Sequence, residues 1–314
     1  MTEDFQRCSL SQKTGKNRED KMHTTIRDGI FKNIVVPFYD TQTVLLVSKQ
    51  VIQFDKNNFI PVARRKAVWV TDVAEIVFKL LEANNIKTAF LKKRESNCLQ
   101  EKRLIMFPTT FIVRRFSLGT YPIRNPYIEY GIEMTSPIVE MFFHTDSPNV
   151  GSAHFRKEPT HRRMQVQFLH DQSGKKIKDA VLHHPEYPDI SDHKCFVSLS
   201  AFPPSRISLE QRILDMEILS KKIFEVLEAF FNSIGIKLTD VKIEFGYSHE
   251  GELLVGDLIS LDSWRILIDG KNHGKKMLFE ENLDIAEVMS RLEKVTEMIR
   301  GSGITDPKKI IPSL

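Results

Sequence analysis

The chain has 314 residues, of which 41% are hydrophobic and 27% charged, and it carries a formal net charge of +4. This length gives one large domain or two closely packed ones, and the charge suits an anionic small ligand while arguing against a nucleic-acid partner. Three scattered cysteines and the lack of an apolar run of ~18 residues argue against a disulfide framework, a thiolate zinc site and a membrane span, so we expect a cytoplasmic protein.

The first part of the chain is expected to form a polar tail followed by a β-rich lobe. Residues 1–25 are polar, and β-branched runs alternate with turn residues from residue 26 onward. A helix is predicted from Thr71 or Asp72, either of which can cap it. We therefore expect residues 26–120 to form an antiparallel sheet with one packed helix.

The second part, residues 121–300, is predicted to contain a strand, a long helix, a hairpin and a terminal helix. Six of the ten histidines fall in 147–194, a segment in which aliphatic residues seldom follow one another. A metal site is one interpretation of these histidines, but their spacing matches no compact ligand motif, and a mobile polar loop is the alternative. Residues 301–314 are expected to form a tail. The order of elements indicates an α+β fold with two lobes.

The long helix is predicted from its cap and from its apolar periodicity. Ser208 and Gln211 form a capping box, and Gly235 is a suitable stop. The expected core-facing stripe consists of Ile213, Leu214, Ile218, Leu219, Ile223, Val226, Leu227 and Phe230.

Charged and apolar residues alternate in the hairpin expected at 239–266. Because alternate strand residues face the same side, Asp240, Lys242 and Glu244 share one face, which should point to water or to a cleft. On the return strand Asp257 interrupts an apolar face, and a buried carboxylate needs a partner. Two interpretations stay open: a salt-bridged sheet face with Lys242 between acids, or a Mg²⁺ site formed by Glu244 and Asp257 with phosphate oxygens.

A second group of polar residues lies where a predicted strand ends in a tight turn. Arg114 and Arg115 end the strand, and Gly119 and Thr120 follow in the turn. Paired arginines and backbone amides suit a phosphate or a carboxylate, although an exposed basic strand end explains them equally. Arg265 offers another phosphate contact, and the basic residues of 63–67 are expected to lie in a solvated loop.

The hairpin sequence DVKIEFG, followed by GDLISLDSWR, resembles the signature of the SAICAR synthetase family, phosphoribosylaminoimidazole-succinocarboxamide synthases. The closest likeness is to the synthetase half of the bifunctional animal enzyme of purine synthesis. FIVRRFSLGTYPIRNP, ANNIKTAFLKK and PIVEMFF are similar to further family segments in the expected order. The resemblance implies an α+β fold with a kinase-like N-terminal lobe, and a chain without the carboxylase half of the animal enzyme.

The same resemblance implies a ligase that uses ATP and Mg²⁺ to join a carboxylated aminoimidazole ribotide to L-aspartate through an acyl phosphate. Glu244 and Asp257 would then face ATP and the metal, and Asp240 and Lys242 the imidazole carboxylate as catalytic residues. Nucleotide contacts are also implied for Gly29 and Lys32. The implied ribotide contacts are Arg114, Gly119, Thr120, Ser263 and Arg265.

Several positions depart from the family pattern. Ile30 replaces the first lysine of a Gly-Lys-x-Lys stretch, and Gln50 stands where an acidic residue is usual. Thr71 and Asp72 replace an Asn-Lys pair, and Glu280 occupies the place of an arginine. Loss of a cation beside a triphosphate could remove about 1.5–3 kcal/mol of charge-assisted bonding.

These departures leave three hypotheses. The first is a SAICAR synthetase-type ligase with reduced or altered activity. The second is a catalytically inactive relative that binds nucleotide or ribotide in a regulatory or partner-binding role. The third, a small-molecule kinase, rests only on the two-lobed fold. Assembly of identical copies is left open by the sequence.

Overall fold

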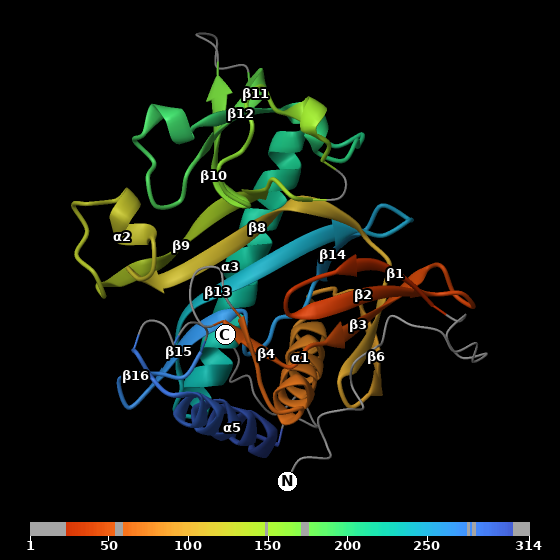
Figure 1. Ribbon diagram of the computed structural model, residues 1–314, viewed down its shortest axis with the longest axis vertical. Coiled ribbons are helices and arrows are strands. Elements are labelled where there is room, and N and C mark those ends of the chain that lie inside the picture. Colours follow the sequence, from red (N-terminus) through yellow and green to blue (C-terminus); the bar gives the residue numbers. More distant parts are fainter. Residues whose placement is uncertain are drawn as a thin grey trace.

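The computed structural model describes residues 23–53, 59–147, 150–170, 176–274, 277 and 281–303. It has the expected α+β architecture, built on two antiparallel sheets and three long helices (Figure 1). The predicted tails at 1–25 and 301–314 lie almost wholly outside the described residues. None of the described helices has the length and apolarity needed to cross a membrane.

The smaller sheet has five strands and forms the N-terminal part of the fold. Its order is β1-β2-β3-β7-β6. The strands are β1 (His23–Asp28), β2 (Lys32–Pro37), β3 (Thr43–Ser48), β7 (Cys98–Lys102) and β6 (Phe90–Glu95). Two short strands, β4 (Val51–Gln53) and β5 (Phe59–Pro61), form a separate pair.

The larger sheet has nine strands and runs through the centre of the molecule (Figure 1). Its order is β12-β11-β10-β9-β8-β13-β15-β16, and β14 pairs with β13. The strands are β12 (Cys195–Ser198), β11 (Lys176–His183), β10 (Arg163–His170), β9 (Glu133–His144), β8 (Ile105–Phe116), β13 (Lys237–Tyr247), β15 (Trp264–Ile268), β16 (Lys271–Asn272) and β14 (Leu253–Gly256). Thus β8 begins the larger sheet, whereas the predicted lobe boundary at residue 120 places it with the smaller one.

Helix α3 (Leu209–Ser233) runs along the central sheet, and the other two long helices lie together at the lower end of the view (Figure 1). Helix α3 packs across β13, β8 and β9, and α1 (Arg65–Ala83) packs against α5 (Ile285–Gly301). One short helix, α2 (Tyr121–Arg124), follows β8, and the described residues also include the 3₁₀ turns η2 (Ser152–His154), η3 (Ser191–His193) and η4 (Leu199–Ala201). The sheets meet where backbone groups of residues 87 and 89 hydrogen-bond to Val255 of β14.

Helix α1 begins earlier than the sequence indicates. Its first residue is Arg65, so Thr71 and Asp72 lie inside the helix and the predicted cap is wrong. Thr71 turns its hydroxyl to the carbonyl of Ala67, at 2.9 Å, as threonines inside helices often do. The basic residues of 63–67 hid this start, and the solvated loop predicted there is also wrong because Lys66 is only 1% exposed.

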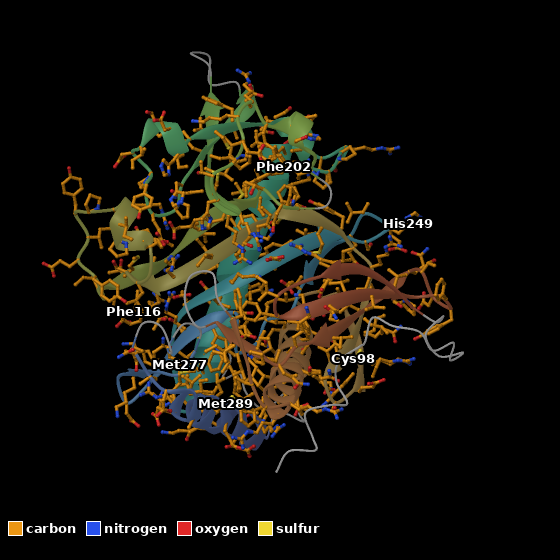
Figure 2. The ribbon with its side chains drawn as sticks, in the orientation of Figure 1. Cys98, Phe116, Phe202, His249, Met277 and Met289 are labelled. Carbon is orange, nitrogen blue, oxygen red and sulfur yellow. The ribbon has the colours of Figure 1, made fainter. Side chains whose placement is uncertain are left out.

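The histidine-rich segment 147–194 contains two strands rather than a mobile loop. Strands β10 and β11 extend the larger sheet beyond β9, and the green part of Figure 1 shows this extension. The rings of His161 and His193 pack on that of His184, with centroids 5.1 and 5.3 Å away. Phe202, labelled in Figure 2, anchors the extension by packing against Phe143. The polar residues of these two strands masked the alternating pattern in the sequence.

The side chains of β13 alternate as predicted. Val241, Ile243 and Phe245 are fully buried on the face toward the core. The caps of α3 also match, since the Ser208 hydroxyl accepts from the backbone N–H of Gln211 at 3.2 Å, and Gly235 adopts a φ of +75° just past the end.

The buried face of α3 is rotated from the predicted stripe. Leu214 and Ile218 are 48% and 59% exposed, while Phe231, absent from the predicted stripe, is fully buried against Trp264 of β15. Consecutive aromatic residues at 230–231 widen the apolar face toward the sheet. The periodicity therefore located the helix correctly and its orientation only approximately.

Replacing Phe231 by Ala should destabilise the chain by about 3–5 kcal/mol, because the cavity left between α3 and Trp264 cannot be refilled by water. The matched control is Leu214→Ala on the exposed side of the same helix, which should change the free energy of unfolding by about 0.5 kcal/mol or less. Urea unfolding of both variants measures the difference. Equal destabilisation would contradict the packing described.

Candidate functional site

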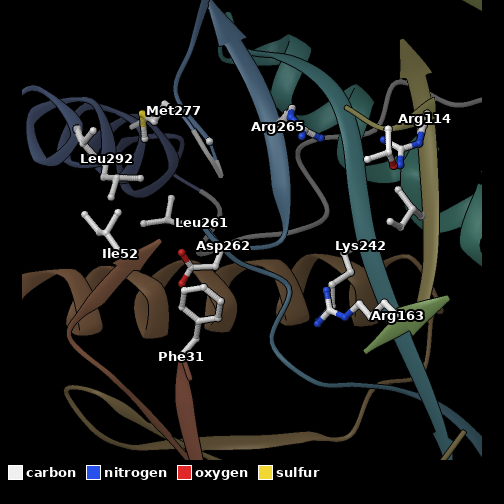
Figure 3. Close-up of a pocket in the computed structure, with 14 residues that line it drawn as sticks. Phe31, Ile52, Arg114, Arg163, Lys242, Leu261, Asp262, Arg265, Met277 and Leu292 are labelled. Atoms are coloured by element: carbon white, nitrogen blue, oxygen red, sulfur yellow. The ribbon is translucent and has the colours of Figure 1, made fainter. Parts of the chain in front are cut away.

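A pocket of about 200 Å³ lies between β8 and β13 of the larger sheet and the elements around α5 (Figure 3). Arg114, Arg163, Lys242 and Arg265 give one side of its wall a cationic character. The opposite side is mostly apolar and is formed by Phe31, Ile52, Leu261, Met277 and Leu292. A half-charged, half-apolar cleft of this kind suits an anionic ligand with an apolar or aromatic portion.

Two carboxylates from neighbouring strands converge beside this pocket. The ammonium of Lys242 lies 2.7 Å from Glu244 Oε1 and 3.2 Å from Asp257 Oδ2. Both acidic side chains are therefore on the same side of the sheet, as the sequence predicted, although neither lines the pocket itself. Burial opposes the ionisation of Glu244, but the surrounding basic groups, of which Lys242 contributes most, together outweigh it and hold the pKa of Glu244 well below its usual range.

The donor set fits a Mg²⁺ ion that is completed by phosphate oxygens. Within the described residues, no three His, Cys, Asp or Glu side chains gather as a metal site. One or two carboxylates are nonetheless the usual protein share when substrate phosphates supply other oxygens. Glu244 and Asp257 already share one cation, the Lys242 ammonium, which shows that their oxygens reach a common point.

Lys32 forms an ion pair with Asp257 across the two sheets. Gly29 makes this geometry feasible, because a Cβ there would lie 2.7 Å from the carbonyl oxygen of Lys32 and would open the tight β1–β2 turn. Burial lowers the pKa of Lys32 to about 7 and raises the pKa of nearby Glu101 to about 7. The sequence analysis missed Glu101, which β7 turns inward and which is only 3% exposed.

A hydrogen-bonded chain behind Glu244 was also missed. The Thr110 hydroxyl donates to Glu244 Oε1 at 3.0 Å and is bonded to His144 Nε2. Since that hydroxyl has one hydrogen, His144 must be the donor through Nε2–H. Burial lowers the pKa of His144 to about 4, despite the Glu244 carboxylate 3.7 Å away, so the imidazole is neutral near pH 7.

Three arginines and two carboxylates form a buried network at the other end of the pocket. Glu140 accepts from Arg114 Nε at 2.6 Å and from Arg124 Nε at 3.2 Å. Asp240 Oδ2 lies 2.9 Å from Arg265 Nη1 and 3.8 Å from Arg114 Nη1. Asp240 is fully buried, so it does not reach the pocket surface but holds the two guanidinium groups that do.

The turn after β8 lies against this network. Gly119 has a φ of +65°, and a Cβ on it would lie 3.1 Å from Arg265 Nη2. Thr120 lines the pocket, and its hydroxyl accepts from Arg124 Nη1 at 2.7 Å. Ser263 is not part of the pocket wall, because its buried hydroxyl donates to a backbone carbonyl of its own turn at 2.8 Å.

An aspartate in the pocket wall and the buried lysine that pairs with it were not assigned to the site from sequence. Lys66 of α1 forms an ion pair with Asp262, and its ammonium lies 5.4 Å from the ring centre of Phe31. Asp262 and Phe31 both line the pocket (Figure 3). The DSW sequence at 262–264 was a signal for Asp262, whereas Lys66 was hidden among adjacent basic residues.

The departures from the family pattern that fall within the described residues do not line the pocket. Ile30 is 39% exposed in the β1–β2 turn. The backbone carbonyl of Gln50 accepts a hydrogen bond from the backbone N–H of Val62, the residue after β5. The Thr71 hydroxyl bonds to the Ala67 carbonyl of its own helix and to the Ser48 hydroxyl of β3, and Asp72 forms ion pairs with two cationic side chains. Glu280 lies outside the described residues.

His144 makes a pH-dependent contribution to the free energy of unfolding, and a substitution at His144 isolates it. Its pKa in the folded chain, about 4, lies below the ordinary value of 6.5, so the unfolded chain binds more protons in this window and stability falls as pH decreases through it. Between about pH 7 and pH 5 the wild type should lose about 2 kcal/mol more than His144→Gln in urea unfolding.

The matched control for that measurement is His249→Gln. His249 lies exposed in the turn after β13 (Figure 2) and should leave the pH dependence of the wild type intact. If His144→Gln and wild type show the same pH dependence, His144 is not buried as a neutral imidazole.

Comparison with known proteins gives a single family. The SAICAR synthetase family model matches residues 33–182 and 187–298. The bifunctional purine synthesis protein purC/E of Dictyostelium discoideum is 26% identical over 246 residues, which cover 78% of this chain and 21% of that protein. The phosphoribosylaminoimidazole-succinocarboxamide synthase of Pyrococcus furiosus is 30% identical over 221 residues, covering 69% of this chain and 74% of that enzyme.

Solved structures share the fold. A SAICAR synthetase in complex with ADP matches with a TM-score of 0.63 and 23% identity, covering 88% of this chain and 97% of that one. The phosphoribosylaminoimidazole-succinocarboxamide synthase of Ehrlichia chaffeensis gives a TM-score of 0.63 at 19% identity, covering 92% and 100%. With the family match extending over both sheets, the chain belongs to the SAICAR synthetase family of ligases.

Proposed function

We propose that the protein is an ATP- and Mg²⁺-dependent amide ligase that joins a carboxylated aminoimidazole ribotide to L-aspartate. The observation that carries the proposal is the convergence of Glu244 and Asp257 on one point beside a cationic pocket. Family membership and the ADP in complex with a structural neighbour support nucleotide binding.

In this proposal the nucleotide phosphates lie near Lys32, Glu244 and Asp257. A Mg²⁺ ion held by the two carboxylates would neutralise phosphate charge and orient the terminal phosphate. The Lys32 ammonium would exchange its ion pair with Asp257 for contacts with the phosphates. The tight β1–β2 turn at Gly29 keeps Lys32 close to Asp257 and thus close to the proposed phosphate position. Lys242 stands between the metal carboxylates and the pocket, where it can contact the group being activated.

The ribotide would occupy the cationic side of the pocket. Arg114 and Arg265 present guanidinium groups there, and both are held by Asp240 from behind. We assign Asp240 the role of a positioning residue, since a fully buried carboxylate cannot touch the substrate. The Gly119–Thr120 turn adds backbone and hydroxyl groups beside Arg265.

The reaction implied by the family proceeds in two displacements. A carboxylate oxygen of the ribotide attacks the terminal phosphorus of ATP, and the bond to the bridging oxygen breaks to release ADP. The amine of L-aspartate then attacks the acyl carbon, phosphate leaves with the bonding electrons, and the nitrogen gives up a proton. Positioning and charge stabilisation by cationic side chains supply most of the catalysis in chemistry of this kind.

A binding role without turnover is the second candidate, and a specific observation favours it. Lys32 and Lys242 already neutralise Asp257 and Glu244, and Ile30 offers no cation to replace Lys32. The two candidates differ in a coupled assay of ADP release with the ribotide, with and without L-aspartate. Aspartate-dependent release supports the ligase, nucleotide binding without release supports the binding role, and aspartate-independent release indicates a kinase.

Asp257→Asn should lower the ligase rate by about 100-fold or more, because the metal loses one of two anionic ligands. Asp257 has a φ of +61°, a conformation that Asn adopts readily, so the fold should persist. The matched control is Asp269→Asn, at a φ of +51° and with an 87% exposed side chain, which should retain the wild-type rate. An Asp257→Asn enzyme with the wild-type rate and Mg²⁺ dependence would contradict the metal role.

A further inference from the structure

Arg163 is the first residue of β10, in the extension that residues 147–194 add to the larger sheet. It pairs with His144 across β9 and β10, so its side chain is carried to the edge of the site. Arg163 lines the pocket, and in Figure 3 its side chain extends from the short green strand to lie beside Lys242. A residue outside the family signature thus reaches the predicted reaction centre.

The guanidinium of Arg163 has no ion pair or side-chain hydrogen bond within the part of the chain that the structure describes. Its neighbours are otherwise matched: Lys242 contacts Glu244 and Asp257, and Lys32 contacts Asp257. Because the two lysines are balanced by the two carboxylates, Arg163 leaves this group of side chains with an excess of positive charge.

A local excess of positive charge favours the binding of an oxyanion such as a phosphate or a carboxylate. Arg163 is an exposed residue and also lines the pocket, so its fork of N–H donors can turn to a ligand without breaking a side-chain contact within the described residues. Lys242 borders the same space and can bond the same group. Repulsion between the two cations is relieved when an anion lies between them.

We propose that Arg163 and Lys242 together bind a phosphate group of a substrate, so that strand β10 completes the site. This inference rests on the proposed function and deepens it by naming a substrate-binding residue. It also accounts for the loss of a cation at Ile30, because the β1–β2 turn supplies only Lys32 while β10 supplies Arg163. The phosphate could come from the nucleotide or from the ribotide.

The test measures binding without turnover, by calorimetric titration of ADP with Mg²⁺ and, separately, of ribose 5-phosphate. Arg163→Gln should weaken one of these by about tenfold or more, the loss expected for one charge-assisted contact. Weakening of ADP assigns the phosphate to the nucleotide, and weakening of ribose 5-phosphate assigns it to the ribotide. Arg163→Lys should recover part of the loss.

The matched control is Arg162→Gln, a neighbouring exposed arginine that does not line the pocket and should bind both probes as the wild type does. Wild-type affinity of Arg163→Gln for both probes would overturn the inference and leave the proposed function standing. If the wild type binds neither probe, the proposed function fails and the inference with it. Because Arg163 is exposed, Arg163→Gln should unfold at the wild-type temperature, which shows that the fold is intact.

Discussion

The whole site depends on one electrostatic constraint, the convergence of Glu244 and Asp257 on the Lys242 ammonium. Three charges this close within a largely buried region are stable only as a matched set, because an uncompensated charge there would be costly. Lys32 joins the set from the smaller sheet, and it thereby ties the two sheets together at the site. A ligand that separates these lysine–carboxylate pairs must supply new partners of opposite charge to each member. A divalent cation and a polyphosphate can do so, because the cation takes the carboxylates and the phosphates take the lysines.

The apolar side of the same strand explains why this arrangement is rigid. Val241, Ile243 and Phe245 are fully buried, so β13 cannot slide by one residue without exposing all three. The neighbouring strands β8, β14 and β15 bring in the remaining polar groups at fixed register: Asp240 lies opposite both Arg114 and Arg265, and Glu244 lies opposite Gly256, next to Asp257. A hydrophobic core on one face thus determines where the charged groups meet on the other.

Strand alternation and helix caps were enough to predict this central part from sequence. The charged face of β13 and the start of α3 both follow local rules, and the structure matches them. The same alternation rule was not applied to Arg114 and Arg115, which were predicted to act as a pair. Adjacent strand residues face opposite sides, and Arg115 accordingly pairs with Glu228 of α3, whereas Arg114 faces the pocket.

The rest required long-range contacts. Lys66 is buried because Asp262, almost two hundred residues away in sequence, pairs with it. Glu101, Thr110 and His144 reach the site from three separate strands, and no short motif joins them. The strands of 147–194 were hidden by polar residues, because an edge extension needs only a partial apolar face. That extension is also what brings Arg163 to the pocket.

The most direct measurement of the central claim is a crystal structure of the protein with Mg²⁺ and ADP. We predict a metal ion bound by the carboxylates of Glu244 and Asp257, with the Lys32 ammonium moved from Asp257 to the phosphates. A structure in which Lys32 and Lys242 still hold the two carboxylates, with the nucleotide bound elsewhere or absent, would contradict it.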